Sequence, residues 1–306
     1  MDLFQLETFL AVAEERSFSR AAARLHRTQP AVSQAIAKLE SELGEILFER
    51  SSRDGTLTDA GGVLREYAQK LLNLRGEAST ALAELRELHS GKLQIAANEY
   101  TCLYLLPLLN EFRRQHPRIK VAVHRSLASR IADEVLNHSV EIGILSFHPD
   151  DSQIKSVVVY RDELMLLVNP SHPFAKTGEV SIRQLGTQNF VAHNIASPQR
   201  LKVVQTFRKY KTPLQMGVEL PSIEAIKRFV EMGNGIALVP GLSARKEVTS
   251  GDLVRIRVRE LQTERKLRLV YRRRAGLSHA ALAFLKVVEA YSLAHGEPYS
   301  FGAERA

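Results

Sequence analysis

The hydrophobic residues in the first part of the chain recur at intervals of three and four, which is the spacing of one helix face. This pattern predicts helices over about residues 3–13, 17–25 and 28–43. The third has the clearest limits, because Pro30 suits a helix start and Gly44 suits a helix end. Three short helices joined by tight turns therefore open the chain.

The third expected helix has an apolar stripe and a polar outer face. The stripe consists of Val32, Ile36, Leu39 and Leu43. The outer face carries Gln29, Ser33, Gln34 and Lys38. Gln and Ser can hydrogen-bond to base edges in a DNA major groove and Lys can reach phosphate, so this face suits a recognition helix. The alternative is an ordinary solvent-exposed face.

After the third helix, residues 47–50 and 56–58 predict two short strands around a turn-rich loop. The loop region carries Arg50 and Arg53. Two strands around such a loop form the wing of a winged helix.

A helix of about 30 residues is expected next, and its apolar residues alternate in spacing between three and four. This heptad seam consists of Leu64, Tyr67, Leu71, Leu74, Ala78, Ala81, Leu85 and Leu88. A helix this long must bury such a stripe, and a second copy of the chain is the simplest partner. The alternative is packing against the chain's own C-terminal part.

From residue 92 onward the pattern changes to short β-branched runs that alternate with amphipathic stretches, so a domain boundary is expected near residues 89–91. The strand candidates are residues 93–97, 119–124, 140–145, 164–168, 190–192, 216–220, 236–239 and 267–271. This alternation predicts an α/β domain with open, mostly parallel sheets and flanking helices.

Composition narrows the class of protein. A length of 306 residues suits about two domains, and 44% hydrophobic with 25% charged residues excludes a disordered chain. The chain shows no apolar run long enough for a membrane span and no secretion signal at its start, so we expect a cytoplasmic protein without membrane contact. The single cysteine, Cys102, excludes an intramolecular disulfide.

Charge is unevenly distributed. The formal net charge is +8, but residues 1–90 hold 11 basic and 14 acidic side chains, whereas residues 91–306 hold 31 and 20. A DNA-binding role for the first part therefore requires local basic clusters, such as Arg16, Arg20, Arg24 and Arg27.

The segment "SFSRAAARLHRTQPAVSQAIAKLESELGEILFER", followed by "LTDAGG", resembles the DNA-binding domain of LysR-type transcriptional regulators. The segments "EIGILSF" and "LPSIEAIKRFVEMGNGIALVPG" resemble hallmark stretches of that family's effector domain. The resemblance implies an N-terminal all-α winged helix-turn-helix at 1–58, a linker and dimerisation helix at 59–90, and a two-lobed α/β effector domain at 91–306. Lobe I would comprise about 91–161 and 269–295, and lobe II about 162–268, with crossing strands near 161–165 and 263–269.

By the same resemblance, the DNA-contacting residues are Gln29, Pro30, Ser33, Gln34 and Lys38, with Arg50 and Arg53 in the wing. The expected partners are an interrupted inverted-repeat DNA operator, a second copy of the chain in a dimer or tetramer, RNA polymerase and a small-molecule effector. Activation of a neighbouring gene and repression of its own are expected of the family.

The effector is expected in the cleft between the lobes, where helices begin after strands and present free backbone N–H groups. Polar residues at these helix starts are Asn98, Tyr100, Thr101, Ser126, Ser129, His193, Ser197 and Ser222. Residues 161–268 carry 18 basic against 10 acidic side chains, which favours a small anion. Alternatively, these Ser and Asn residues are only helix caps. Ala128 stands where the family often has Ser or Thr, so the effector's identity stays open.

We expect no metal site and no cofactor, because the histidines lack paired ligand spacing and no phosphate-binding glycine loop is present. No catalytic motif such as GxSxG or HExxH occurs, so no catalytic residue is assigned and an enzyme is not expected. The sequence predicts a DNA-binding regulator controlled by a small molecule. The alternative is a small-molecule-binding protein whose DNA recognition has decayed.

Overall fold

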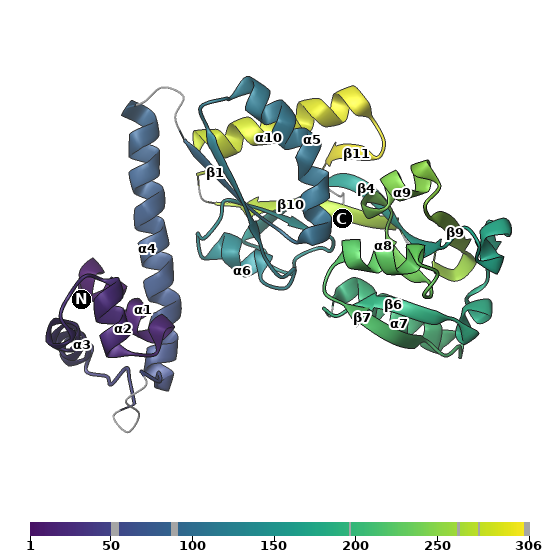
Figure 1. Ribbon diagram of the computed structural model, residues 1–306. Coiled ribbons are helices and arrows are strands. Elements are labelled where there is room, and N and C mark those ends of the chain that lie inside the picture. The colour runs from purple at the N-terminus through teal and green to yellow at the C-terminus, as the bar shows by residue number, and fades with distance from the viewer. Residues whose placement is uncertain (50–54, 87–90, 196, 262–263, 275, 303–306) are drawn as a thin grey trace. The chain divides into compact units, whose positions relative to one another are not determined.

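The structure is a computed structural model that describes residues 1–49, 55–86, 91–195, 197–261, 264–274 and 276–302, with the side chains of 80, 81 and 83–86 outside the description (Figure 1). The described residues form two compact units. The first is built around four helices and the second is a mixed α/β domain.

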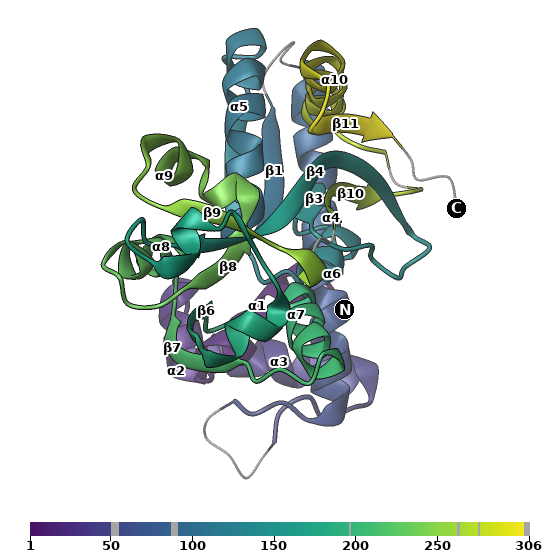
Figure 2. The ribbon, with the colours of Figure 1, turned by 90° about the vertical axis from the view of Figure 1, so that its right-hand side faces the viewer.

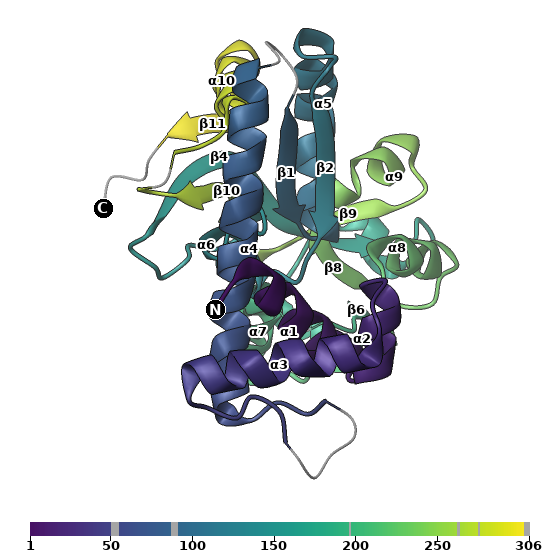
Figure 3. The same cartoon turned by 90° about the vertical axis from the view of Figure 1, so that its left-hand side faces the viewer.

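The first unit contains α1 (Leu3–Glu15), α2 (Phe18–Arg24), α3 (Gln29–Leu43) and the long α4 (Asp59–Arg86). Figures 1 and 3 show α1, α2 and α3 gathered around one end of α4. The predicted limits of α3 are confirmed, because Gly44 ends the helix in the left-handed conformation with φ +71°. Between α3 and α4, Phe48 pairs with Leu57 in an antiparallel bridge. The predicted wing residues Arg50 and Arg53 lie outside the described residues.

The core of this unit gathers apolar side chains from all four helices and the bridge. Its members include Leu6, Phe9, Val32, Ile36, Leu39, Phe48 and Ala68. Three of the four residues of the predicted α3 stripe are therefore buried, but Leu43 is 39% exposed. Leu43 is the last residue of α3, and the chain turns away at Gly44 before that side chain can be covered.

The long helix α4 has two apolar faces instead of one seam. Ala68 is fully buried, and Leu64 and Leu72 pack against the core of the first unit. The other face is exposed and carries Val63, Tyr67, Leu71, Leu74 and Leu82. Leu64 was expected in the dimer seam but belongs to its own unit, while Val63 and Leu82 extend the exposed face. The side chains of Leu85 and Leu88 lie outside the description.

The second unit is built on a large sheet with the strand order β2-β1-β3-β10-β4-β9-β5, to which β8 and β11 add by pairing with β4. Its strands are β1 (Lys92–Ala97), β2 (Lys120–Arg125), β3 (Ile142–Leu145), β4 (Ile154–Val168), β5 (Glu179–Val180), β8 (Ala237–Pro240), β9 (Val254–Val258), β10 (Glu264–Arg272) and β11 (Tyr299–Gly302). A second, two-stranded parallel sheet holds β6 (Asn189–His193) and β7 (Gln215–Leu220).

The helices of this unit are α5 (Glu99–Gln115), α6 (Ile131–Leu136), α7 (Pro198–Lys209), α8 (Ile223–Glu231), α9 (Arg245–Ser250) and α10 (His279–His295). Short 3-10 turns are η1 (Pro173–Lys176), η2 (Ile182–Thr187), η3 (Gly241–Ser243) and η4 (Arg259–Leu261). Helices α5 and α10 share one core with β1, β3, β4 and β10, whereas α7 and α8 pack in separate cores with β6 and β8.

Strand β4 crosses from one lobe of this unit to the other. Its first half pairs with β10 and β11 at Tyr160, and its last residues pair with β8 and β9 at Leu166 (Figure 2). The predicted strand over 164–168 is thus only the end of a strand of 15 residues. The expectation of mostly parallel sheets is right for β1–β2, β1–β3 and β6–β7, but all pairings of β4 are antiparallel. The reason is that β4 and β10 traverse the lobes in opposite directions.

Candidate functional site

The outer face of α3 presents polar side chains to solvent. Gln29, Pro30, Gln34 and Lys38 are exposed and Ser33 is partly buried, while Val32 and Ile36 on the opposite face are 1% and 3% exposed. The amide Nε2 of Gln29 donates a hydrogen bond to Ser33 Oγ at 3.0 Å. Lys38 Nζ lies 4.0 Å from Glu42 Oε1 at the helix surface. This face therefore offers donors and acceptors with the freedom to reach a ligand in solution.

The basic cluster expected near this face is partly neutralised. Arg24 Nη1 lies 2.5 Å from Glu14 Oε2 and 3.3 Å from Glu15 Oε1, and the hydrogen bond that Arg24 donates to Glu14 raises the pKa of Arg24. Arg20 Nε lies 3.8 Å from the same Glu15. Arg27 instead lies over the ring of Phe4, at 5.6 Å from its centroid. Two of the four expected arginines thus have acidic partners within their own unit.

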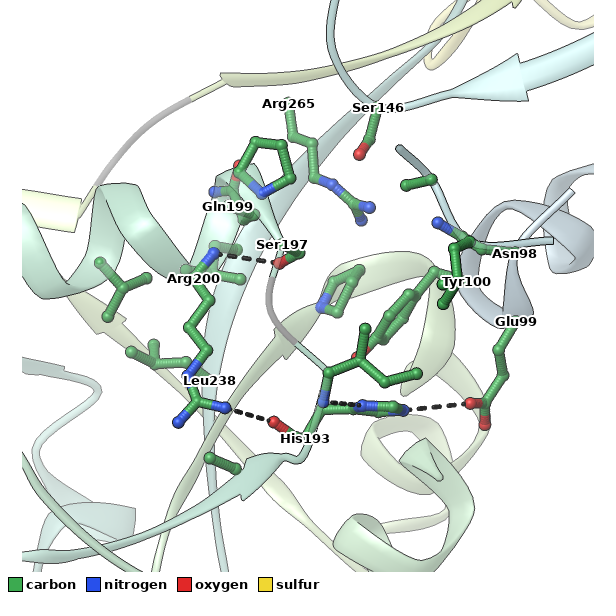
Figure 4. Close-up of a pocket in the computed structure, with 18 of the residues that line it drawn as sticks. Asn98, Glu99, Tyr100, Ser146, His193, Ser197, Gln199, Arg200, Leu238 and Arg265 are labelled. Carbon is green, nitrogen blue, oxygen red and sulfur yellow. Dashed lines mark hydrogen bonds and ion pairs between the residues drawn. The ribbon is translucent and has the colours of Figure 1, made fainter. Parts of the chain in front are cut away.

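A cavity of about 480 Å³ lies between the lobes of the second unit. It brings together six of the predicted effector residues: Asn98, Tyr100, Ser126, Ser129, His193 and Ser197. They come from the start of α5, the loop after β2, the end of β6 and the start of α7. Figure 4 shows Asn98, Tyr100, His193 and Ser197 among them. The cavity is also lined by Glu99, Ser146, Arg125, Arg200 and Arg265, and by many apolar side chains.

Thr101 and Ser222 are not among the residues that line this cavity. Thr101 is fully buried, and its Oγ1 accepts a hydrogen bond from Asn98 N at 3.0 Å and lies 3.3 Å from Ile144 O. Ser222 Oγ accepts from Ala225 N at 3.2 Å and so caps α8. Ser222 therefore acts as a helix cap, which was the alternative interpretation of the Ser and Asn residues, and Thr101 completes the capping box of Asn98 at the start of α5. Asn98 and Ser197 also cap helices, yet they line the cavity.

The start of α8 is occupied by a carboxylate of the chain itself. Glu99 Oε1 accepts a hydrogen bond from Ile223 N at 2.9 Å, and Glu99 Oε2 lies 3.4 Å from His193 Nε2. Glu99 belongs to α5, whereas Ile223 and His193 belong to the other lobe. An internal anion therefore takes the helix N-terminus that was expected to hold part of the effector.

Arg265, which the sequence prediction missed, lies in β10 and points into the cavity beside Ser146 (Figure 4). The residue is only 6% exposed. Its Nη1 lies 3.4 Å from Asp162 Oδ2, its guanidinium lies 5.8 Å from the centroid of the Tyr100 ring, and its Nε has no hydrogen-bond partner among the described residues. Burial lowers the pKa of Arg265 and raises that of Asp162. The sequence did contain a signal for this residue. In a strand alternate residues share a face, so Arg265 lies on the same buried face as Leu267 and Leu269.

Two family models match the chain. The model described as "Bacterial regulatory helix-turn-helix protein, lysR family" matches residues 3–62, and the "LysR substrate binding domain" matches residues 86–292. The chain belongs to the LysR family of transcriptional regulators. It is therefore a DNA-binding transcriptional regulator with an effector-binding domain, as the resemblance predicted, and its family is one of regulators and not of enzymes.

Relatives of this LysR regulator carry the name "Probable RuBisCO transcriptional regulator". The one from Cyanophora paradoxa is 33% identical over 92% of this chain and 89% of its own length. The one from Porphyra purpurea is 34% identical over 88% of this chain and 87% of its own length. Among solved structures, the LysR family regulator CbnR has a TM-score of 0.72 at 20% identity, covering 95% of this chain and 99% of CbnR. A structure of CbnR with its target DNA has a TM-score of 0.70 at 22% identity, covering 95% and 99%. The likeness to CbnR shows the fold.

In the described part of this LysR regulator, no helix is both long and apolar enough to cross a membrane. The same residues contain no group of three or more His, Cys, Asp or Glu side chains that could hold a metal ion. Cys102 is half-buried beside the core of α5 and α10, and burial raises the pKa of its thiol, which disfavours the reactive thiolate.

Proposed function

We propose that this LysR regulator reads DNA through α3 as a dimer and is controlled by a small anion bound in the cavity between its lobes. The observation that carries the effector part is Arg265, a cation that lines the cavity, is only 6% exposed and pairs with Asp162 through Nη1 at 3.4 Å. A guanidinium has five N–H donors and Asp162 accepts from Nη1 alone, so an anion in the cavity can supply further acceptors to this buried cation.

On the DNA side, Gln29, Ser33 and Gln34 contact base edges in this proposal, with Pro30 beside them, and Lys38 contacts phosphate. Arg50 and Arg53, which lie outside the described residues, contact the backbone from the wing. Two copies of α3 read the two halves of an interrupted inverted repeat. Contact with RNA polymerase at the promoter belongs to the same proposal.

The dimer is held by the exposed face of α4, formed by Val63, Tyr67, Leu71, Leu74 and Leu82. Apolar side chains at this spacing along one helix need a partner surface, and a second α4 offers a matching one. Leu85 and Leu88 continue the same repeat in the sequence. Association of two such dimers into a tetramer is part of the family pattern that we extend to this chain.

The effector is held, in this proposal, by Arg265 together with Asn98, Tyr100, Ser126, Ser129, His193 and Ser197. A ligand that contacts both lobes binds more tightly when the lobes are closed. It therefore shifts the regulator toward the closed state.

The relatives suggest the first target genes to test. Several are named as RuBisCO regulators at 32–34% identity over 88–94% of this chain. We propose genes for RuBisCO as the first operators to examine, by gel shift with their upstream DNA and with an unrelated promoter as control.

The DNA part is tested with Ser33→Ala combined with Gln34→Ala. Each lost base contact costs about 1 to 3 kcal/mol, so specific binding should weaken strongly in a gel shift while the mass of the dimer is unchanged. Specific binding that survives this double substitution would refute the assignment of α3.

The effector part is tested by thermal shift of the full chain against small carboxylates, sulfate, phosphate and sugar phosphates. An anion at 100 times its Kd should stabilise the effector domain by about 2.7 kcal/mol. Arg265→Lys keeps a charge beside Asp162 but loses the planar guanidinium, so the shift should shrink. Arg257→Lys, on the exposed side of β9, is the matched control. Failure of every anion to shift the transition would refute an anionic effector.

A further inference from the structure

We propose that the effector is a small monocarboxylate with a compact apolar body, and that Glu99 excludes ligands with a second anionic group. This inference rests on the proposed function of the cavity between the lobes. It specifies the chemistry of the ligand and assigns a specificity role to a residue that points into the same cavity.

The anionic end of the ligand lies at Arg265. Asp162 already pairs with Nη1 of this guanidinium, while Nε has no hydrogen-bond partner among the described residues. A carboxylate is planar and can accept two parallel hydrogen bonds from one edge of a guanidinium. Ser146 lies next to Arg265 at this end of the cavity and supplies a hydroxyl donor (Figure 4).

One wall of the cavity is suited to an apolar group. The second lobe contributes Leu164, Phe190, Val203, Leu214, Met216 and Leu238. A polyol or a sugar phosphate would lose hydrogen bonds to water here without replacing them, whereas a hydrocarbon gains from leaving water. A cavity of about 480 Å³ limits the body to a compact group.

A second anionic group on the ligand would meet Glu99. This carboxylate is fixed by its hydrogen bond from Ile223 N and by His193, at a different end of the cavity from Arg265 (Figure 4). Two carboxylates close together in a low-dielectric cavity repel each other. The Glu99 carboxylate also accepts the hydrogen bond from the backbone amide of Ile223 at the start of α8. This amide is therefore not available to a second anionic group of the ligand.

The other cations of the cavity do not compensate for this repulsion. Arg200 donates to His193 O at 2.7 Å and pairs with Glu219, so its guanidinium is engaged. Arg125 lies at the exposed end of β2, where water and salt screen its charge. Arg265 is therefore the cation that selects the anionic end, and Glu99 limits the ligand to one such end.

Calorimetric titration of the full chain tests the inference with three probes. Benzoate carries one carboxylate on an apolar ring, terephthalate adds a second at the opposite end, and fructose 1,6-bisphosphate represents sugar phosphates. We expect benzoate to bind at least 10-fold more tightly than either of the others. Glu99→Gln keeps an acceptor for Ile223 N but removes the charge, so it should reduce the preference for benzoate over terephthalate at least 10-fold. Glu111→Gln, partly exposed on the same helix and not among the residues that line the cavity, should leave the preference unchanged.

The outcomes separate this inference from the proposed function. Binding of terephthalate or the sugar phosphate as tight as benzoate, lost in Arg265→Lys, would overturn the monocarboxylate while the anion site stands. An unchanged preference in Glu99→Gln would overturn the role of Glu99. Absence of binding by all three probes, and by the wider anion panel, would overturn both the inference and the proposed effector site.

Discussion

Two adjacent glycines at the start of α4 have opposite surroundings. A Cβ atom added at Gly61 would lie 2.2 Å from the carbonyl oxygen of Leu47, whereas one added at Gly62 meets nothing within 4 Å. We expect Gly61→Ala to destabilise the first unit by about 1–3 kcal/mol, because backbone must move to relieve the overlap. Gly62→Ala should stabilise it by up to about 1 kcal/mol through helix propensity. Calorimetric melting of both variants measures the difference, and equal melting temperatures would contradict it.

The buried pair of Asp162 and Arg265 gives a second prediction at the scale of residues. Both side chains are 5% exposed, and Asp162 Oδ1 also accepts from Leu242 N at 3.1 Å. Asp162→Asn leaves Arg265 as an uncompensated buried charge, so we expect a loss of about 3–5 kcal/mol of unfolding free energy. Asp162→Asn combined with Arg265→Met removes both charges and should recover much of that loss. Denaturant unfolding compares the two variants, and a double variant less stable than the single one would speak against a charge effect.

These residues also show what local sequence can and cannot predict. The faces of α3 follow from a helical period within 15 residues, so Val32 and Gln34 could be assigned to inside and outside correctly. The pairing of Asp162 with Arg265 depends on two strands whose partners are about a hundred residues apart in the chain. Glu99 likewise meets Ile223 only when the lobes are assembled. Periodicity carries no information about such distant contacts.

At the scale of elements, α4 divides its apolar surface between its own unit and solvent. The heptad spacing predicted one seam, but the core of the first unit covers the first part of α4 and takes apolar residues there. Leu64 near the start turns to the core, and Val63, Tyr67 and Leu71 stay outside. Strand β4 was also predicted only in part. Its middle carries the polar residues Arg161 and Glu163, so the sequence pattern predicted its last residues alone, although the strand continues through both lobes.

The exposed face of α4 predicts the effect of charge on association. Tyr67→Lys combined with Leu71→Lys places two cations where a partner helix would have to bury them. Burying one large apolar side chain is worth about 1.5–3 kcal/mol, so the dimer Kd should rise at least 100-fold. Glu66→Lys, exposed on the same helix but outside this face, is the matched control. Light scattering would show a shift toward the monomer mass for the double variant alone, and an unchanged mass would place the dimer contact elsewhere.

At the scale of the whole molecule, charge is concentrated away from the DNA-binding part. Residues 1–90 have three more acidic than basic side chains, and Arg20 and Arg24 are paired with acids. Residues 1–90 thus have no surplus of positive charge for phosphate, so the salt dependence of DNA binding should be modest and sensitive to each basic contact. The logarithm of the binding constant falls with the logarithm of salt by about 0.9 per phosphate contact.

This distribution predicts a specific change in that slope. In a dimer, Lys38→Ala removes one proposed phosphate contact from each protomer, so the slope should decrease in magnitude by about 2. Lys246→Ala, on the exposed surface of the effector domain, changes the net charge equally and should leave the slope unchanged. The measurement is a series of fluorescence-anisotropy titrations at increasing salt, with an operator selected from a random-sequence library. Equal slopes for the two variants would mean that α3 does not lie along the DNA backbone at Lys38. A change of about 1 would mean that only one of the two helices contacts phosphate there, and the inverted-repeat arrangement would have to be abandoned.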